Sequence, residues 1–365
     1  MKTKCLYIHI PFCQAICSYC DFCKIYYQGD LVDQYLQAVA KELEELNIVE
    51  KLSTIYIGGG TPSSLSYQQL ELLMLIIAPY ISEQTIEVSI EINPESMDTK
   101  KLEIVKQGRV NRLSIGVQTF DEQILLSIER KHNNDQVINI INEAKRLGFD
   151  NISIDLMYGL PEQTISSIER DLDIVKALDI QHISYYSLIL EKHTRLNNEN
   201  YKVLDSDIET QIQDCIDEKL FSMGFKQYEI SNYAKANFTS KHNLAYWKYD
   251  NYYGIGIGAS SKIDNKIIEH NRNIYAYLKG GETRKETLLS TEDSLFNHIM
   301  MSLRLLEGLD IQQVNTLYHI DLEKKYGVII SKYIHKGWLH ITEGRLHCNS
   351  QSIRLLNTIL IDFLE

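Results

Sequence analysis

The chain has 365 residues, 44% hydrophobic and 24% charged, which is long enough for a large core and two or three domains. The formal net charge of -12 disfavours binding to nucleic-acid phosphates, so we expect no nucleic-acid partner and disfavour an RNA-modifying enzyme. No apolar run approaches the roughly 18 residues of a membrane-spanning helix, and the N-terminus lacks the apolar core of a secretion signal, so we expect a cytoplasmic protein.

Short β-branched runs alternate with longer helical patterns through the first half of the chain. Six strands are predicted at residues 5–10, 54–57, 86–90, 112–117, 151–156 and 182–188. Helices are predicted between them at residues 30–47, 66–78, 98–107, 121–129, 135–147 and 165–178. This alternation predicts an α/β fold with a parallel sheet and crossover helices, and six such units fit an incomplete TIM-like (β/α)6 barrel.

Polar or glycine-rich segments follow five of the predicted strands. They read HIPFC, GGGTPS, EINPES, GVQTF and DLMYGLP in chain order. Ordinary turn chemistry would account for any one of them. In parallel α/β folds, however, the carboxyl ends of the strands carry the chemistry, so five such segments in register predict a site at this edge of the sheet.

The composition shifts twice after the last predicted strand of the barrel. Aromatic residues crowd together between about 225 and 262, and a region of short helices opens near 290. We therefore predict a barrel domain at 1–225, an aromatic-rich connecting segment at 226–285 and a small C-terminal domain at 286–365. A terminal β-hairpin is expected in this last domain, which favours a winged-helix form.

The cysteines are concentrated at one end of the chain. Five of the seven lie within residues 5–23, and an odd, crowded set is a poor disulfide framework. Cys13, Cys17 and Cys20 have the spacing C-x3-C-x2-C, which suits three irons of a [4Fe-4S] cluster and leaves the fourth iron open. The alternative is a tetrahedral zinc site that also uses Cys23, and the position of the motif directly after a first barrel strand disfavours it.

These motifs resemble a known family. The stretch YIHIPFC-x3-C-x2-C, which begins at Tyr7, is similar to the radical SAM family. With GGGTPS, DLMYGLP and HNLAYW it resembles, more narrowly, the oxygen-independent coproporphyrinogen III dehydrogenases and their heme chaperone branch. The likeness extends to about Ser261 and continues more weakly to the C-terminus. It implies a [4Fe-4S] cluster on the three cysteines, with S-adenosylmethionine bound to the open iron.

The resemblance also implies contacts to S-adenosylmethionine from the first two strand ends. Tyr19 would press on the adenine, and Tyr7 would approach from the first strand. Gly59, Gly60 and Thr61 match a loop whose bare backbone contacts the methionyl amino group. Glycine suits this loop because a side chain would block such an approach.

Further implied contacts lie at the later strand ends. Glu91 matches a carboxylate that receives ribose hydroxyls or the amino group, although capping or loop hydrogen bonding is an alternative role for both Glu91 and Asp155. Gln118, Arg130 and Asp155 match additional contacts, and some of them surround a second S-adenosylmethionine in the dehydrogenase. Cys23 departs from the family pattern, and we expect that it is not a cluster ligand, because a fourth thiolate would close the open iron.

The run HNLAYW, which begins at His242, resembles a signature of the heme chaperones. A neutral imidazole is a good axial ligand for heme iron, and aromatic neighbours can stack on a porphyrin. The alternative is a histidine that only packs among aromatic side chains. The resemblance implies that heme and an apo-hemoprotein acceptor are the partners, and a membrane-bound acceptor would fit such a chaperone.

The alternative function is that of the coproporphyrinogen III dehydrogenase itself, a radical SAM oxidative decarboxylation. Only 12 residues precede Cys13, whereas the dehydrogenase has a long N-terminal extension over its active site. This difference makes the heme chaperone our first expectation.

Overall fold

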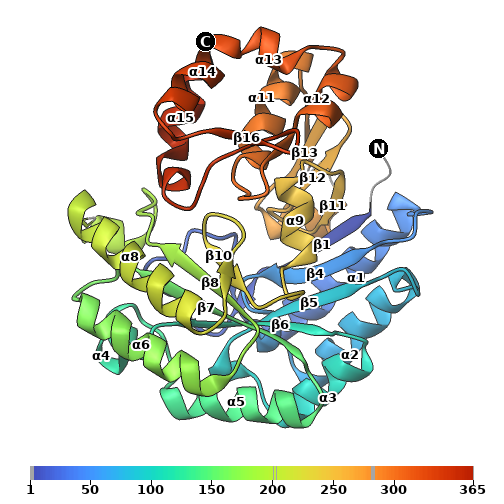
Figure 1. The fold of residues 1–365 in the computed structure, drawn as a ribbon. Coiled ribbons are helices and arrows are strands. Elements are labelled where there is room, and N and C mark those ends of the chain that lie inside the picture. Colours follow the sequence, from blue (N-terminus) through green and yellow to red (C-terminus); the bar gives the residue numbers. More distant parts are fainter. Residues whose placement is uncertain (1–3, 200, 203, 281–283, 365) are drawn as a thin grey trace.

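A computed structural model describes residues 4–199, 201–202, 204–280 and 284–364 (Figure 1). Residues 1–3, which begin the predicted first domain, lie outside these ranges. No helix within them is both long and apolar enough to cross a membrane.

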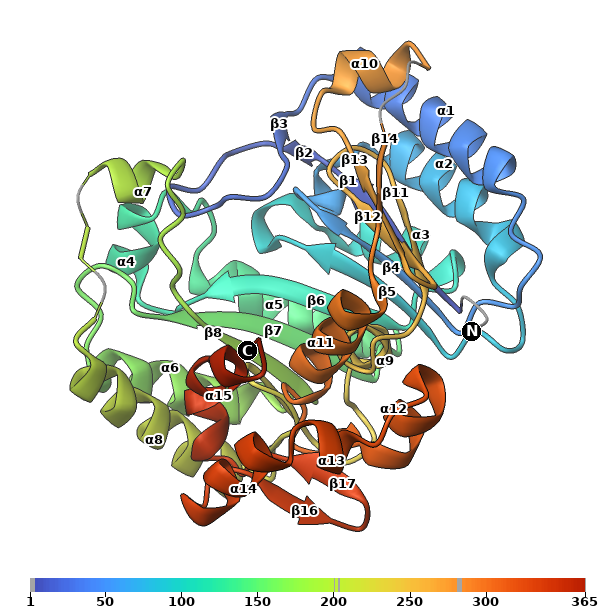
Figure 2. The same cartoon turned by 90° about the horizontal axis from the view of Figure 1, so that it is seen from above.

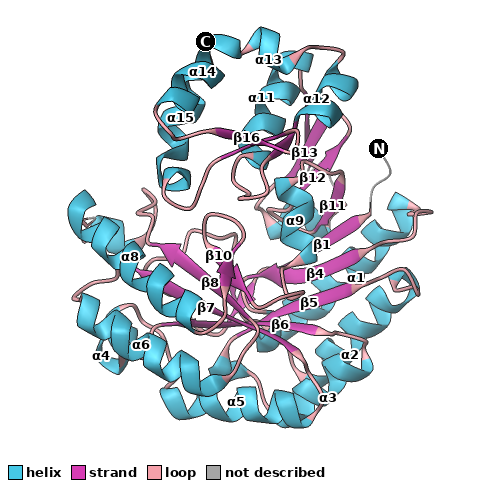
Figure 3. Ribbon diagram, in the orientation of Figure 1, coloured by secondary structure: helices cyan, strands magenta, loops and turns pink. Residues whose placement is uncertain are grey.

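The six predicted strands lie side by side and parallel in one sheet, in chain order. They are β1 (Cys5–Ile10), β4 (Thr54–Gly59), β5 (Glu87–Ile92), β6 (Arg112–Gln118), β7 (Asn151–Tyr158) and β8 (His182–Ser187). Their outer face is covered by helices in cyan (Figure 3). These are α1 (Gly29–Leu46), α2 (Tyr67–Ile77), α3 (Thr99–Gln107), α4 (Glu122–Ser127), α5 (Asn134–Arg146), α6 (Ile165–Leu178) and α8 (Ser206–Ser222). The predicted α/β barrel is confirmed.

The segment 226–285, predicted as a connection, extends this sheet at both edges. At one edge, β10 (Asn232–Ala234) pairs antiparallel with β8, and β9 (Lys226–Gln227) pairs antiparallel with the other side of β10. At the other edge, β11 (Tyr252–Ile255) pairs parallel with β1. Antiparallel strands complete that side: β12 (Ser260–Ile263), β13 (Lys266–His270) and β14 (Arg284–Leu288). In the described chain β9 and β14 are the edges of the sheet, so the barrel is open.

The C-terminal region has its own hydrophobic core, separate from that of the barrel. The predicted terminal hairpin is β16 (His340–Thr342) and β17 (Arg345–His347), and β15 (Leu309–Asp310) adds a third strand. The helices around it are α11 (Thr291–Ser302), α12 (Ile311–Tyr318), α13 (Leu322–Lys325), α14 (Gly327–His335) and α15 (Leu356–Asp362). Figure 1 shows this region, in orange and red, above the open side of the sheet.

Candidate functional site

A cavity of about 360 Å³ lies at the carboxyl ends of the barrel strands, and we call it the cluster cavity. All of the predicted site residues except Tyr7 and His242 line it. Those residues are Cys13, Cys17, Cys20, Tyr19, Gly59, Gly60, Thr61, Glu91, Gln118, Arg130 and Asp155. The strand-end segments seen in the sequence therefore meet in one place.

The cysteine loop reaches across the mouth of the barrel. It runs between two short strands, β2 (Phe12–Cys13) and β3 (Ile25–Tyr26), which pair in parallel. Figure 2 shows this blue loop extending toward α4 and α7 (Arg195–Asn198). Ser18 ties its tip to both, because its N–H donates to the carbonyl of Ile128 at 3.3 Å and its carbonyl accepts from the N–H of Leu196 at 2.9 Å.

The thiols lie among groups that can stabilise bound thiolates. The Thr61 hydroxyl donates to Cys13 Sγ at 3.4 Å, and Arg130 Nη1 donates to Cys17 Sγ at 3.7 Å. Burial raises the pKa of Cys13 to about 11, so a proton stays on the free thiol until a metal replaces it. Three thiolates on a cubane each bind a different iron and need not converge on one point. Among the described residues, no group of three or more His, Cys, Asp or Glu is placed to hold a single metal ion.

Cys23 does not line the cluster cavity. Its side chain is buried against Gly258, where an added Cβ would lie 2.6 Å from Cys23 Cβ. Its carbonyl oxygen is hydrogen-bonded to His9 Nε2 at 2.7 Å. His9 therefore positions the end of the cysteine loop through the backbone, and the structure gives it no place on the cavity wall.

The glycine loop after β4 has no room for side chains. Gly59 has a φ of +119°, and a Cβ there would lie 2.5 Å from the ring of His9. A Cβ on Gly60 would lie 2.7 Å from the backbone of Pro11 and 3.0 Å from Cys13 Sγ. Glycine is thus required by the close approach of the loop to the cysteine motif, which leaves bare backbone beside the thiols.

Glu91 lines the cavity and accepts two hydrogen bonds. The N–H of Gly59 donates to its Oε2 at 2.9 Å, and the hydroxyl of Tyr56 donates to its Oε1 at 2.9 Å. Burial raises the pKa of Glu91 to about 7, and nearby Asp155 acts in the same direction. This carboxyl can therefore either accept or donate a hydrogen bond near neutral pH.

Arg130 lines the cavity and lies at the centre of a polar network. Its Nη2 donates to Asn93 Oδ1 at 3.2 Å and to the carbonyl of Gly116, and Asn93 Nδ2 donates to Thr61 Oγ1 at 3.2 Å. Gln118 sits at a β-bulge with a φ of +66°. Its Oε1 and the Nε of Arg130 are buried without a hydrogen-bond partner among the described residues. Unpaired buried polar atoms are rare, so these two fit a polar ligand such as S-adenosylmethionine.

Sequence reasoning missed several residues that line the cavity. The hydroxyl of Ser114 donates to Asp155 at 3.2 Å, and burial raises the pKa of this carboxyl. The other missed residues with polar side chains are Asp21, Lys24, Tyr56, Asn93, Arg112, Ser184, Tyr186, Ser187 and Asn243. A signal was present, because alternate residues of a regular strand face the same side: Arg112 and Ser114 are polar residues on one face of β6 before its bulge, and Leu113 and Ile115 lie on the other.

Tyr7 lies behind the cavity wall instead of on it. Its hydroxyl is hydrogen-bonded to His9 Nδ1 at 2.9 Å, and its ring stacks on Tyr56 with 6.2 Å between the centroids. It is thus not on the cavity wall, and its contact to S-adenosylmethionine stays a prediction.

His242 is fully buried at the start of α9 (Lys241–Trp247). Its Nδ1 is hydrogen-bonded to Thr54 Oγ1 at 2.8 Å, and its Nε2 to the Tyr246 hydroxyl at 2.8 Å. Burial lowers its pKa to about 3, so the imidazole is neutral, but neither ring nitrogen is available. The geometry is that of a packed histidine. Heme ligation by His242 stays a prediction, and it requires at least one of these hydrogen bonds to break.

Comparison with known proteins gives consistent matches. Residues 7–175 match the radical SAM superfamily, and residues 289–355 match the HemN C-terminal domain. The heme chaperone HemW of Lactococcus lactis is 36% identical, over 100% of this chain and 98% of its own length. HemW of Bacillus subtilis is 36% identical over 99% of each chain. In structure, the coproporphyrinogen III oxidase HemN of Escherichia coli matches 99% of this chain and 90% of its own, with a TM-score of 0.87 and 22% identity.

Proposed function

Because the chain belongs to the heme chaperone HemW family of radical SAM proteins, we propose that it binds heme and transfers it to acceptor hemoproteins. The observation that carries this proposal is the likeness to HemW over the whole length of both chains. The likeness to HemN, at 22% identity, indicates a common fold only.

The cluster cavity supports the proposed cofactors, a [4Fe-4S] cluster and S-adenosylmethionine. Cys13, Cys17 and Cys20 would hold the cluster, which supplies one-electron chemistry when both groups are bound. Arg130 and Gln118 line the same cavity, and each has a buried polar atom without a partner among the described residues. Glu91, with its pKa near 7, holds the glycine loop through the N–H of Gly59.

A heme titration of anaerobically reconstituted protein, followed by absorbance, tests the proposal. We expect saturation near one heme per chain. The His242→Ala variant should lose this binding if the histidine leaves its packed position to ligate iron. A matched control is His298→Ala, because His298 is also buried and lies between Tyr249 and Tyr318, in contact with the C-terminal core.

Each result has a distinct meaning. Saturable binding that survives in His242→Ala would assign the iron ligand to another residue and leave the chaperone proposal intact. Equal loss in both histidine variants would point to unfolding, which circular dichroism would reveal. No saturable binding in the wild-type protein would overturn the proposal, and turnover of coproporphyrinogen III would then be the assay for the dehydrogenase alternative.

Coupling of the cluster to heme transfer is a separate part of the proposal. A cluster-free variant, with alanine at Cys13, Cys17 and Cys20, should bind heme yet transfer it more slowly to an apo-hemoprotein. A normal rate of heme transfer by this variant would show that transfer is not coupled to the cluster.

A further inference from the structure

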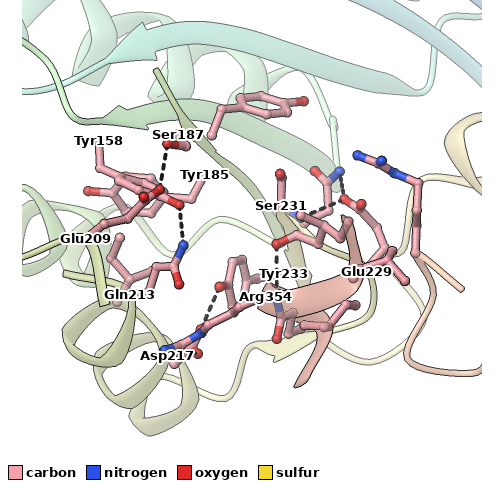
Figure 4. Close-up of a pocket in the computed structure, with 18 of the residues that line it drawn as sticks. Tyr158, Tyr185, Ser187, Glu209, Gln213, Asp217, Glu229, Ser231, Tyr233 and Arg354 are labelled. Atoms are coloured by element: carbon pink, nitrogen blue, oxygen red, sulfur yellow. Dashed lines mark hydrogen bonds and ion pairs between the residues drawn. The ribbon is translucent and has the colours of Figure 1, made fainter. Parts of the chain in front are cut away.

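A second cavity of about 400 Å³ lies beside the cluster cavity, between the barrel and the C-terminal region. It is shown in Figure 4, with Tyr158, Glu209 and Gln213 on one side and Glu229 on the other. Tyr186, Ser187, Ile189 and Asn243 line both cavities, so the two spaces share a wall. The functional site described above does not use this second cavity.

The walls of the second cavity carry polar atoms that the chain leaves unpaired. Tyr185 is only 3% exposed, and its hydroxyl has no hydrogen-bond partner among the described residues. The indole N–H of Trp247 and Nε of Arg304 are also buried atoms without a hydrogen-bond partner among the described residues. These three atoms can donate, whereas Gln227 Oε1 and Asn232 Oδ1 on the same walls are acceptors without a partner among the described residues. Buried polar atoms without partners are costly unless a ligand or water pairs with them.

Arg304 makes no ion-pair contact with a carboxylate among the described residues, although burial lowers its pKa, Glu229 of the same cavity acts to raise it, and Arg304 acts to lower the pKa of Glu229 against the effect of burial. Its guanidinium lies over the ring of Trp247, 4.9 Å from the centroid, and forms no ion pair or hydrogen bond within the described chain. The other arginine of the cavity, Arg354, is already paired with Asp214 at 2.7 Å and with Asp217 at 2.6 Å. A planar guanidinium held against an indole is suited to receive a carboxylate in a fixed fork.

Three carboxyl groups of the described residues line the cavity; Asp217 is paired with Arg354, and the other two, Glu229 and Glu209, could oppose an anionic ligand. Burial raises the pKa of Glu229 to about 7, and this group accepts from the side-chain amide of Asn232 and, at 3.3 Å, from the N–H of Ser231. A ligand carboxylate nearby would raise its pKa further and keep it neutral. Glu209 lies on the other side and accepts from the Ser187 hydroxyl at 2.9 Å.

The shared wall presents apolar surface next to this polar pocket. Ile189 is 71% exposed and Tyr186 is 40% exposed, although both are large side chains. Phe22, 64% exposed, lines the cluster cavity from the cysteine loop. A ligand across this wall would need an apolar body and an anionic end that reaches Arg304. Heme has this chemistry, with a flat macrocycle and two propionate side chains.

We propose that Arg304 receives the propionate carboxylates of heme in the second cavity, with Trp247 behind its guanidinium and the macrocycle against Tyr186 and Ile189. This inference rests on the proposed heme-binding function and adds to it the residue that recognises the carboxylate end. Arg304 is thus a binding residue that lies far along the chain from the cysteine motif.

Titrations with hemin and with hemin dimethyl ester, in which both propionates are blocked, test this assignment by absorbance. We expect the wild-type protein to bind hemin at least about tenfold more tightly than the ester, because a charge-assisted hydrogen bond is lost with the ester. Arg304→Gln should weaken hemin binding about tenfold and leave ester binding unchanged. The hemin affinity of Arg304→Lys should lie between those of the wild-type protein and Arg304→Gln, since lysine keeps the positive charge but lacks the forked geometry of the guanidinium.

Arg345→Gln is the matched control. It removes a positive charge from the same region, but Arg345 pairs with Glu307 and Asp310 and does not line the cavity. It should bind both compounds as the wild-type protein does. Hemin binding unchanged in Arg304→Gln, or hemin and ester weakened equally, would overturn the assignment while the chaperone proposal stands. Failure of the wild-type protein to bind hemin saturably would instead overturn the proposed function, and this inference with it.

Discussion

The chemistry of single residues in this site is set by burial and by a few close partners. Glu91 and Asp155 face one cavity, and burial raises the pKa of both carboxyls. His242 shows the opposite shift, because burial disfavours the charged imidazole. The same residue types on the surface would keep ordinary pKa values, so the fold determines the charge at the site.

The cysteine assignment gives a prediction at this scale. Alanine at Cys13, Cys17 or Cys20 should each lower iron after anaerobic reconstitution from about four per chain to near zero, because two thiolates hold a cubane poorly. Cys23→Ala should retain the iron, since Cys23 is buried against Gly258 outside the cavity. Iron and acid-labile sulfide analyses measure the cluster content of each variant. Loss of the cluster in Cys23→Ala would show that Cys23 is a cluster ligand after all.

A buried carboxylate predicts a pH dependence of stability. Asp171 on α6 accepts from the hydroxyl of Thr119 at 2.7 Å and from the N–H of Phe120 at 2.9 Å, and burial raises its pKa to about 6 from 3.8. Between these two pH values the folded state holds a proton that the unfolded state has lost. The contribution of Asp171 to the free energy of unfolding is therefore present below about pH 4 and lost as the pH rises through about 6.

The measurement is denaturant unfolding between pH 4 and pH 7. Asp171→Asn should flatten this part of the pH dependence, whereas Asp173→Asn, a change at an exposed position of the same helix, should leave it as in the wild-type protein. An unchanged slope in Asp171→Asn would mean that other buried carboxyls account for it.

At the scale of elements, close packing between strands and helices decides where side chains fit. Gly256 follows β11 with a φ of +92°, and an added Cβ would lie 2.2 Å from the hydroxyl of Tyr35 on α1. That hydroxyl donates to the carbonyl of His9 at 2.8 Å and accepts from the N–H of Ile257 at 3.2 Å. It thus links α1 to the ends of β1 and β11.

Gly256→Ala should therefore lower the free energy of unfolding by at least about 2 kcal/mol, from backbone strain and the clash together. Gly224→Ala is a matched control, because Gly224 has a φ of +84° but nothing within 4 Å of an added Cβ. It should lose only the backbone part, about 1 kcal/mol. Equal losses in the two variants, measured by denaturant unfolding, would show that the Tyr35 contact adds nothing.

For the whole molecule, the attachment of the C-terminal region to the barrel forms the second cavity. Arg354, before α15, is paired with Asp214 and Asp217 of α8. Asp217 also accepts from the Tyr233 hydroxyl at 2.6 Å, and Figure 4 shows Arg354, Asp217 and Tyr233 together at the cavity. These ion pairs therefore hold a cavity wall as well as two regions of the fold.

Arg354→Gln should weaken this attachment by about 1–2 kcal/mol, since the pairs are partly shielded from solvent. We expect faster release of a C-terminal fragment in limited proteolysis. Lys332→Gln serves as the comparison, because it breaks an ion pair to Asp362 inside the C-terminal region and should leave proteolysis unchanged. If both variants are cleaved at the wild-type rate, the apolar contacts between the two regions are sufficient to hold the C-terminal region on the barrel without these ion pairs.

The sequence by itself determined the barrel, its strand positions and the cysteine loop, because periodicity and spacing are local properties that a single segment displays. It also placed most strand-end residues at one site, since parallel strands bring their carboxyl ends to one edge. Only the tertiary structure decided that Tyr7 and His242 lie behind the cavity wall, because the alternation of a strand and the turn of α9 do not say which neighbour covers a side chain. The second cavity was equally hidden, since it joins β8, residues 227–233, Arg304 and Arg354, which meet only after long-range packing.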